Sequence, residues 1–174
     1  MSRHASVTIE EPTLSRNERR RNRTRQQLLD STAALLIELG YDALTVQDIT
    51  DDADVARATF YIHFQDKEEV VWAILEEHFA HLVGLLSTLD EPDPERWRYL
   101  KFFGLFKYVQ ENKALMQVLL SERGHVRLRQ QIVQFMARSL TEDMDRGKIE
   151  RTGSGPAIFE ATFYAGAILN VAAW

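Results

Sequence analysis

The sequence predicts an all-α protein, and three observations support this prediction. Apolar residues recur at three- and four-residue steps along most of the chain, as they do on the buried face of a helix. No stretch alternates β-branched and polar residues in the way that is typical of a strand. Two short helical segments joined by a tight link stand between longer ones, which is the plan of a helix-turn-helix.

Clear breaks and caps divide the chain into helices. Gly40 is expected to end the first helix, and Thr45 followed by Asp48 has the spacing of a capped helix start. Asp66 is expected to cap a long helix, and a run rich in Asp and Pro at 90–94 interrupts the pattern. We expect helices at about residues 15–39, 46–53, 56–64, 66–89, 95–110, 113–121, 125–147 and 157–174.

Composition excludes several classes of protein. The 174 residues suit one or two small domains, and the absence of cysteine excludes disulfides, thiolate metal sites and a cysteine nucleophile. The first 15 residues lack the apolar core of a secretory signal, so we expect a cytoplasmic protein whose tail at 1–15 is disordered.

Charge is distributed unevenly along the chain. The net charge is −5, yet residues 1–25 hold seven arginines and three glutamates, a local charge of +4, which leaves −9 for the rest. A basic arm on an acidic body is typical of a segment that contacts nucleic acid. Its arginines, Arg21 and Arg23 among them, are expected to follow a DNA backbone or to enter a minor groove.

The second short helix, at 56–64, has two different faces. Phe60 and Phe64 lie one turn apart and are expected to point into the core. The opposite face then offers Ala58 and Ile62, with Thr59 beside them and Arg57 at the exposed start of the helix. An outward isoleucine suits contact with deoxyribose or with a thymine methyl group in a major groove.

The side chains around this helix match the chemistry of a DNA duplex. Arg57 can bind a guanine edge or a phosphate, and Thr59 can bind either a base edge or a phosphate. Tyr61 and His63 have polar tips on short stems, which suit phosphates. Further phosphate contacts are expected from Thr45 and Gln47, at the start of the first short helix, and from Lys67.

These residues carry a resemblance to a known family. The chain resembles the DNA-binding domain of TetR-family transcriptional regulators over about residues 20–75, most specifically in the run Thr59-Phe-Tyr-Ile-His-Phe-Gln-Asp-Lys67. The resemblance implies a dimeric regulator, usually a repressor, with a DNA-binding domain at 16–66 and a helical ligand-binding and dimerisation domain at 67–174. It also implies that Gln47, Arg57, Ala58 and Thr59 face bases, whereas Thr45, Tyr61, His63 and Lys67 contact phosphates.

The sequence departs from the family pattern at three places. Asp54 occupies the turn where glycine is usual, but aspartate tolerates the left-handed backbone that such a turn needs. Ile62 stands where a polar or aromatic residue is common, which bears on the choice of operator. The chain stops at Trp174, where the family has one more helix, so we expect the last helix to be missing.

The C-terminal part suggests a pocket and an interface. Its many large apolar residues are expected to form a helical core, with a pocket for a mostly apolar effector lined by Phe103, Phe106, Met116, Leu119 and Phe135. Small residues recur along 157–174, and we expect the stripe of Ala161, Ala165, Gly166 and Leu169 to pack in a dimer.

Other functions find less support in the sequence. We find no framed acid pair, nucleophile elbow or phosphate-binding glycine loop, and so expect neither an enzyme nor a bound cofactor. His78 and His81 are more typical of polar packing than of a metal site, and the segment 157–174 is short for a membrane span. The alternatives are an activating or ligand-independent regulator of the same fold, and a helical protein of membrane surfaces.

Overall fold

The computed structural model describes residues 15–120 and 126–172, and within them it contains helices and no strands. This confirms the expected all-α class. Most of the expected tail and the end at Trp174 lie outside the described residues. The described helices are α1 (Arg16–Ala43), α2 (Val46–Asp52), α3 (Arg57–His63), α4 (Lys67–Ser87), α5 (Pro94–Glu111), α6 (Lys113–Leu120), α7 (Val126–Asp145) and α8 (Ala157–Ala172).

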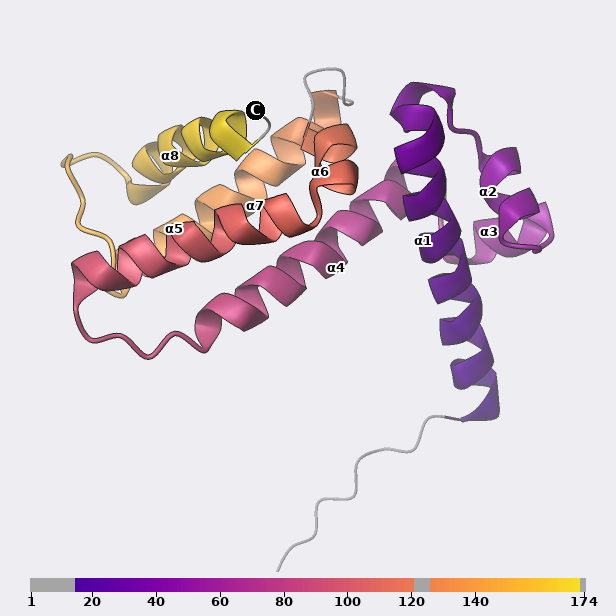
Figure 1. The fold of residues 1–174 in the computed structure, drawn as a ribbon, viewed down its shortest axis with the longest axis horizontal. Helices are drawn as coiled ribbons and strands as arrows, with labels where there is room; N and C mark the ends of the chain where they lie inside the picture. Colours follow the sequence, from indigo (N-terminus) through magenta and orange to yellow (C-terminus); the bar gives the residue numbers. More distant parts are fainter. Residues whose placement is uncertain (1–14, 121–125, 173–174) are drawn as a thin grey trace, which may run out of the picture.

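The first helix runs further than the sequence pattern predicts at its C-terminal end. Gly40 has a φ of 75°, outside the helical region, and so it interrupts the helix at the expected position. Residues 41–43 add a further helical turn beyond this kink, before Leu44 leaves in an extended conformation. The N-terminal half of α1 extends away from the rest of the molecule, as Figure 1 shows.

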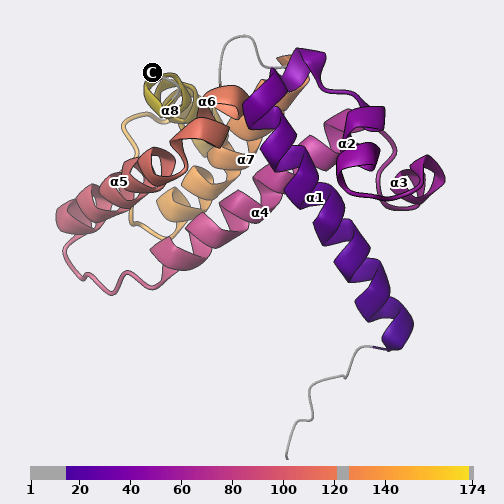
Figure 2. The ribbon, with the colours of Figure 1, turned by 45° about the vertical axis from the view of Figure 1, so that its right-hand side comes forward.

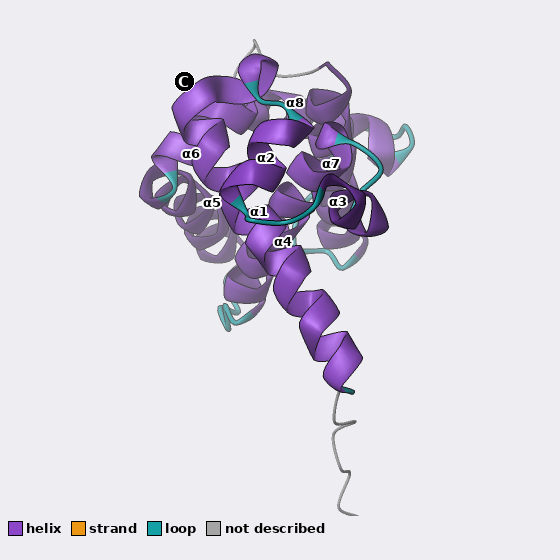
Figure 3. Ribbon diagram, turned by 90° about the vertical axis from the view of Figure 1, so that its right-hand side faces the viewer, coloured by secondary structure: helices purple, strands orange, loops and turns teal. Residues whose placement is uncertain are grey.

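The helices form two groups that α4 connects. Helices α2 and α3 lie beside α1 at one end, and α4 leads from there into the bundle of α5, α7 and α8 (Figures 1 and 2). Helix α6 packs against α1, so that the two groups also meet at a second place. Viewed from the α2–α3 end, those two short helices face outward with α1 extending below them (Figure 3).

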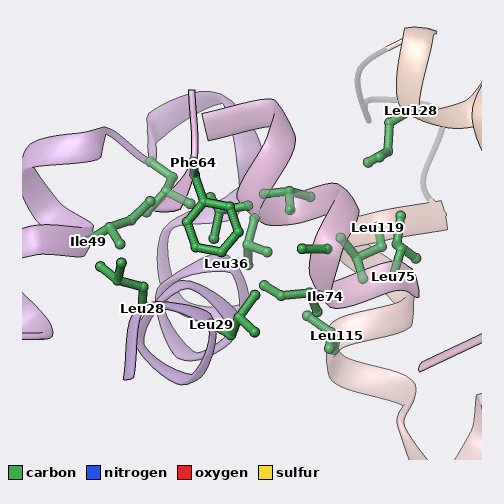
Figure 4. Packing of buried hydrophobic residues seen from close by; sticks show 14 of the residues in the cluster. Leu28, Leu29, Leu36, Ile49, Phe64, Ile74, Leu75, Leu115, Leu119 and Leu128 are labelled. Atoms are coloured by element: carbon green, nitrogen blue, oxygen red, sulfur yellow. The ribbon is translucent and has the colours of Figure 1, made fainter. Parts of the chain in front are cut away.

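One continuous core joins the two groups. Leu28 and Leu36 of α1, Ile49 of α2 and Phe64 meet Ile74 of α4 in the cluster shown in Figure 4. The same cluster continues into the C-terminal part through Leu115 and Leu119 of α6 and Leu128 of α7. Because side chains in such cores are close-packed, a shift of α4 cannot leave α1 and α6 unaffected.

A second, smaller core lies between α7 and α8. It is built on Ala137 and Leu140 of α7 and on Ala161 and Ala165 of α8, all buried. At another point of the bundle, α5 comes so near α4 that a Cβ added to Gly104 would lie 2.8 Å from Leu86 Cδ2. Small residues therefore set how closely these helices approach each other.

Among the described residues, α4 is long and apolar enough to cross a membrane, judged by length and composition alone. In the fold its N-terminal half is the centre of the larger core, with Val70, Val71 and Leu75 fully buried against the neighbouring helices. A mostly buried core helix of a globular protein passes the same test, and 33% of the window in α4 is buried, so this feature is weak evidence for a membrane role.

Candidate nucleic-acid interface and ligand cavity

The start of α2 has the cap that the sequence predicts. The Asp48 amide donates to Thr45 Oγ1 at 3.2 Å, and the Thr45 amide donates to Asp48 Oδ2 at 2.9 Å. The Thr45 hydroxyl also donates to the same carboxylate, at 2.6 Å. These hydrogen bonds from Thr45 lower the pKa of Asp48, because they favour the ionised carboxylate. The Thr45 hydroxyl is thus already engaged within the cap.

The link between α2 and α3 is a tight turn centred on Asp54. Asp54 has a φ of 52°, so the left-handed conformation that the sequence departure requires is present. The turn is closed by the Val55 amide, which donates to the Thr50 carbonyl at 3.0 Å. Aspartate therefore fills the turn position where the family pattern has glycine, and it adopts the left-handed backbone that joins the two short helices.

Helix α3 presents its two faces as predicted. Phe60 is fully buried and Phe64 nearly so, and their rings lie 5.8 Å apart, behind the helix. Arg57 and Ala58 are exposed, Thr59 is half-buried, and 65% of Ile62 is exposed to solvent. The outward face of α3 is therefore free to meet a partner, while two phenylalanines anchor the helix from behind.

The polar side chains around α3 form local contacts that orient them. Arg57 Nη2 donates to the Tyr61 hydroxyl at 3.3 Å, and the guanidinium carbon lies 5.9 Å from the centre of the Tyr61 ring. Gln47 donates to Asp51 at 2.7 Å, one turn further along α2. Burial, together with the nearby charges of Arg21 and Arg25, lowers the pKa of His63, which favours the neutral imidazole.

Lys67 has partners within the protein that sequence reasoning missed. Its ammonium donates to the carbonyls of Tyr41 and Leu44, at 2.8 Å each, and lies 4.4 Å from the centre of the Tyr41 ring. These carbonyls belong to the last turn of α1, beyond the Gly40 kink, and to the residue before the Thr45 cap. Lys67 therefore fastens the start of α4 to the α1–α2 junction, and its role at a phosphate stays a prediction.

The arginines of α1 divide into two groups. Arg16, Arg19, Arg20, Arg21 and Arg23 are exposed on the protruding half of the helix. Arg25 instead forms an ion pair with Glu77 of α4, at 2.8 Å, and lies over the Phe64 ring. The basic arm is thus helical from Arg16 onward, and a capping box between Ser15 and Glu18 secures its first turn.

The described part of the C-terminal bundle holds a cavity of about 350 Å³ between α4, α5 and α7. Of the five residues predicted to line a pocket, only Phe135 borders this cavity. Phe103 and Phe106 are exposed on the other side of α5, and Met116 and Leu119 are buried in the core around α1. The pattern of apolar residues alone does not distinguish these three environments.

The stripe of small residues on α8 has a different partner from the one expected. Ala161, Ala165 and Leu169 are buried within the same subunit, where α8 packs against α7, and Gly166 is half-buried beside them. The exposed face of α8 carries large residues instead, with 71% of Phe159 and 73% of Phe163 open to solvent. Close approach of helices, which the small residues do promote, occurs here inside one chain.

Two histidines of α4 take part in packing. His78 Nδ1 lies 2.5 Å from the Tyr108 hydroxyl of α5, and the ring of His81 lies 5.8 Å from that of Tyr108. Burial lowers the pKa of His78. No group of three or more potential metal ligands occurs among the residues that the structure describes.

Comparison with known proteins agrees with this geometry. Residues 28–74 match the family described as bacterial regulatory proteins, tetR family. The HTH-type transcriptional repressor DhaR of Mycobacterium sp. (strain GP1) is 37% identical over 71 residues, which are 41% of this chain and 36% of DhaR. The chain aligns with about half or less of the length of the first curated relatives.

Solved structures extend the likeness to most of the chain. FadR from Bacillus subtilis, solved in complex with stearoyl-CoA, superposes with a TM-score of 0.62 at 20% identity, covering 85% of this chain and 84% of FadR. The fatty acid degradation regulator FadR from Bacillus halodurans gives a TM-score of 0.64 at 19% identity, covering 86% and 82%. Residues 28–74 are therefore similar to the helix-turn-helix of the tetR family of bacterial regulatory proteins, and most of the chain has the fold of the solved structures that it resembles.

Proposed function

We propose that this chain is a dimeric, ligand-responsive regulator of transcription that represses by binding a palindromic operator. Residues 16–66 act as the DNA-binding domain, and residues 67–174 act as the regulatory and dimerisation domain. The observation that carries this proposal is the outward face of α3, where Arg57, Ala58 and Ile62 are exposed on a helix of the size that a major groove accepts.

The residues around α3 are mostly acidic, so the positive charge that attracts DNA must come from α1. Asp48, Asp51, Asp52 and Asp54 lie on α2 and in the turn, whereas α3 itself carries the single cation Arg57. The segment of α2, the turn and α3 would by itself repel the negatively charged DNA backbone. The exposed arginines of α1 reverse this balance, so α1 supplies phosphate contacts while α3 reads the bases.

Dimerisation uses the exposed face of α8 in this proposal. Phe159 and Phe163 stand on one side of the helix, and an open aromatic surface of this kind is typical of a protein–protein contact. In the proposed dimer two copies of α3 bind successive major grooves, about 34–36 Å apart on a palindrome.

Ligand control acts through α4. The cavity borders α4 at Phe79, and the same helix carries Glu77, whose carboxylate pairs with Arg25 of α1. A ligand that fits the cavity better in one position of α4 than in another shifts the population between DNA-binding and released states. The complex of FadR from B. subtilis with stearoyl-CoA supports the idea that this fold accommodates an apolar effector.

Selection from a randomised duplex library, followed by binding measured as fluorescence anisotropy, tests the proposal. We expect a palindromic site whose affinity falls steeply with salt. Arg57→Ala should relax the choice at one base position and cost about 1–3 kcal/mol, while Arg138→Ala, an exposed arginine of α7, should change nothing. Absence of any selected sequence would refute the proposal, and a reporter gene downstream of the selected site distinguishes repression from activation.

A further inference from the structure

The cavity has two chemically different ends. Toward the helix-turn-helix it is bordered by Phe79 of α4 and Phe135 of α7, whose rings stack 4.7 Å apart, and by Leu105. Toward the other end of the bundle it is bordered by charged residues from the first turns of α5 and from the end of α7. The space is therefore amphipathic along its length.

Cations outnumber carboxylates at the charged end. Lys101 is paired with the buried Asp143, and Arg146 is paired with Glu142 at 3.4 Å. Two further cations, Arg98 and Lys148, border the same cavity. Among the residues that the structure describes, neither has a carboxylate within 4.0 Å.

The backbone holds Lys148 at this place. Gly147 has a φ of 70°, and the amides of Lys148 and Ile149 both donate to the Asp143 carbonyl, which turns the chain back over the end of α7. The Lys148 ammonium then lies 5.8 Å from the Trp97 ring, the same ring over which Lys101 lies at 4.8 Å. Lys101 has its anion in Asp143, so Lys148 is the cation beside this ring that has no carboxylate within 4.0 Å among the described residues.

The carboxylate of Asp93 does not neutralise Arg98. Asp93 caps α5, where its Oδ1 accepts hydrogen bonds from the amides of Glu95 and Arg96, at 2.8 and 3.1 Å. The charge of Arg98 contributes only the last of the causes that lower the pKa of Asp93. Arg98 is half-buried where it borders the cavity.

We infer that the effector is an amphiphile with an anionic head group, bound by Arg98 and Lys148 at the outer end of the cavity. Its apolar chain extends toward Phe79 and Phe135. This deepens the proposed function, on which it rests, by fixing the charge of the ligand and its direction. A volume of about 350 Å³ is at the low end of the range of small-molecule sites, so one short or medium chain fills it.

Three probes with the same ten-carbon alkyl group and different head groups test which head-group charge the cavity prefers: decanoate, decanol and decyltrimethylammonium. Binding to the full chain is measured by isothermal titration calorimetry below the concentrations at which these compounds form micelles. We expect decanoate to bind most tightly and the ammonium compound most weakly. Equal affinity of decanoate and decanol, or no binding by either, overturns the inference.

Single substitutions test the residues. Arg98→Gln and Lys148→Gln should each weaken decanoate binding by about tenfold and leave decanol binding unchanged, because each removes one charge-assisted contact to the head group. Lys107→Gln is the matched control, since Lys107 lies on α5 outside the cavity and pairs with Glu111. Parallel losses for decanoate and decanol would show that the two residues only shape the cavity, which contradicts the inference.

Operator binding in the presence of decanoate separates the two proposals. If decanoate binds through Arg98 and Lys148 but DNA stays bound, the anionic site stands and ligand control of DNA binding fails. If the chain binds its selected operator but takes up no decanoate, the regulator stands and the anionic site fails.

Discussion

Arg25 of α1 and Glu77 of α4 are joined by an ion pair of 2.8 Å, and the same guanidinium lies 5.4 Å from the centre of the Phe64 ring. One side chain thus contacts α4 and Phe64, the residue that follows α3. Phe79, which borders the cavity, is two residues from Glu77 on α4. The pair therefore ties α4, the helix that borders the cavity, to α1 and to the residue that follows the helix that we propose reads DNA.

A double-mutant cycle at Arg25 and Glu77 should measure how much their ion pair contributes to the stability of the fold. Their side chains are 39% and 46% exposed, so solvent screens the pair and its coupling energy should be only about 0.2–1 kcal/mol. Arg25→Gln should lower the free energy of unfolding more than Glu77→Gln, because it also removes the contact with Phe64. Urea denaturation measures both, and equal losses would show that the Phe64 contact contributes nothing.

Lys67 and Arg23 should behave in opposite ways when replaced. Lys67→Met leaves the Tyr41 and Leu44 carbonyls without that donor, so the free energy of unfolding should fall by about 1–3 kcal/mol. Arg23→Gln removes an exposed cation and should leave stability unchanged, yet reduce the slope of log affinity for DNA against log salt by about 1. Urea denaturation and salt titrations measure the two quantities. A reduced slope in Lys67→Met with unchanged stability would instead identify Lys67 as a phosphate contact.

His78 should make stability depend on pH. Burial lowers its pKa below the ordinary 6.5, with His81 acting in the same direction and Glu77 opposing it. Just below pH 6.5 the unfolded chain takes up a proton that the folded chain refuses, so the free energy of unfolding decreases as pH falls through this window. Above the window the effect vanishes. His63, whose pKa is also lowered, adds to the same trend.

The variant His78→Gln tests this dependence. Urea denaturation between about pH 7 and pH 5.5 should give a smaller loss of stability for His78→Gln than for the unsubstituted chain, by at most about 1.4 kcal/mol per pH unit. His81→Gln is the comparison variant, because His81 is exposed one turn further along α4 and is only the last of the causes that shift the pKa of His78, so its replacement should change the pH slope less. Identical pH slopes in all three proteins would mean that His78 does not titrate in this range.

The sequence predicts local features well because short-range chemistry determines them. The cap at Thr45, the left-handed Asp54 and the inward pair of Phe60 and Phe64 all follow from spacing along one helix or turn. Partners that are distant in the sequence were missed: Lys67 with the carbonyls of Tyr41 and Leu44, and Arg25 with Glu77. Nothing in a helical pattern tells which exposed charge will meet another helix.

The positions of the expected pocket and stripe residues in the fold could not be predicted from the sequence for a related reason. Phe103 and Phe135 are equally apolar in the sequence, but one is exposed on α5 and the other borders the cavity. The stripe of Ala161 and Ala165 does indicate a close helix partner, and the fold supplies it from α7 of the same chain. The periodicity of a sequence predicts which face of a helix is apolar, but it does not predict which element packs against that face.

Phe163→Glu should dissociate the proposed dimer without unfolding the subunit. The side chain is 73% exposed, so a carboxylate there remains in water in the monomer. In a symmetric interface each substitution occurs twice, and burying a phenylalanine contributes about 1.5–3 kcal/mol, so affinity should fall more than hundredfold. Sedimentation velocity measures the oligomeric state. Phe103→Glu, at another exposed aromatic, should leave the dimer intact, and dissociation by Phe103→Glu alone would move the interface from α8 to α5.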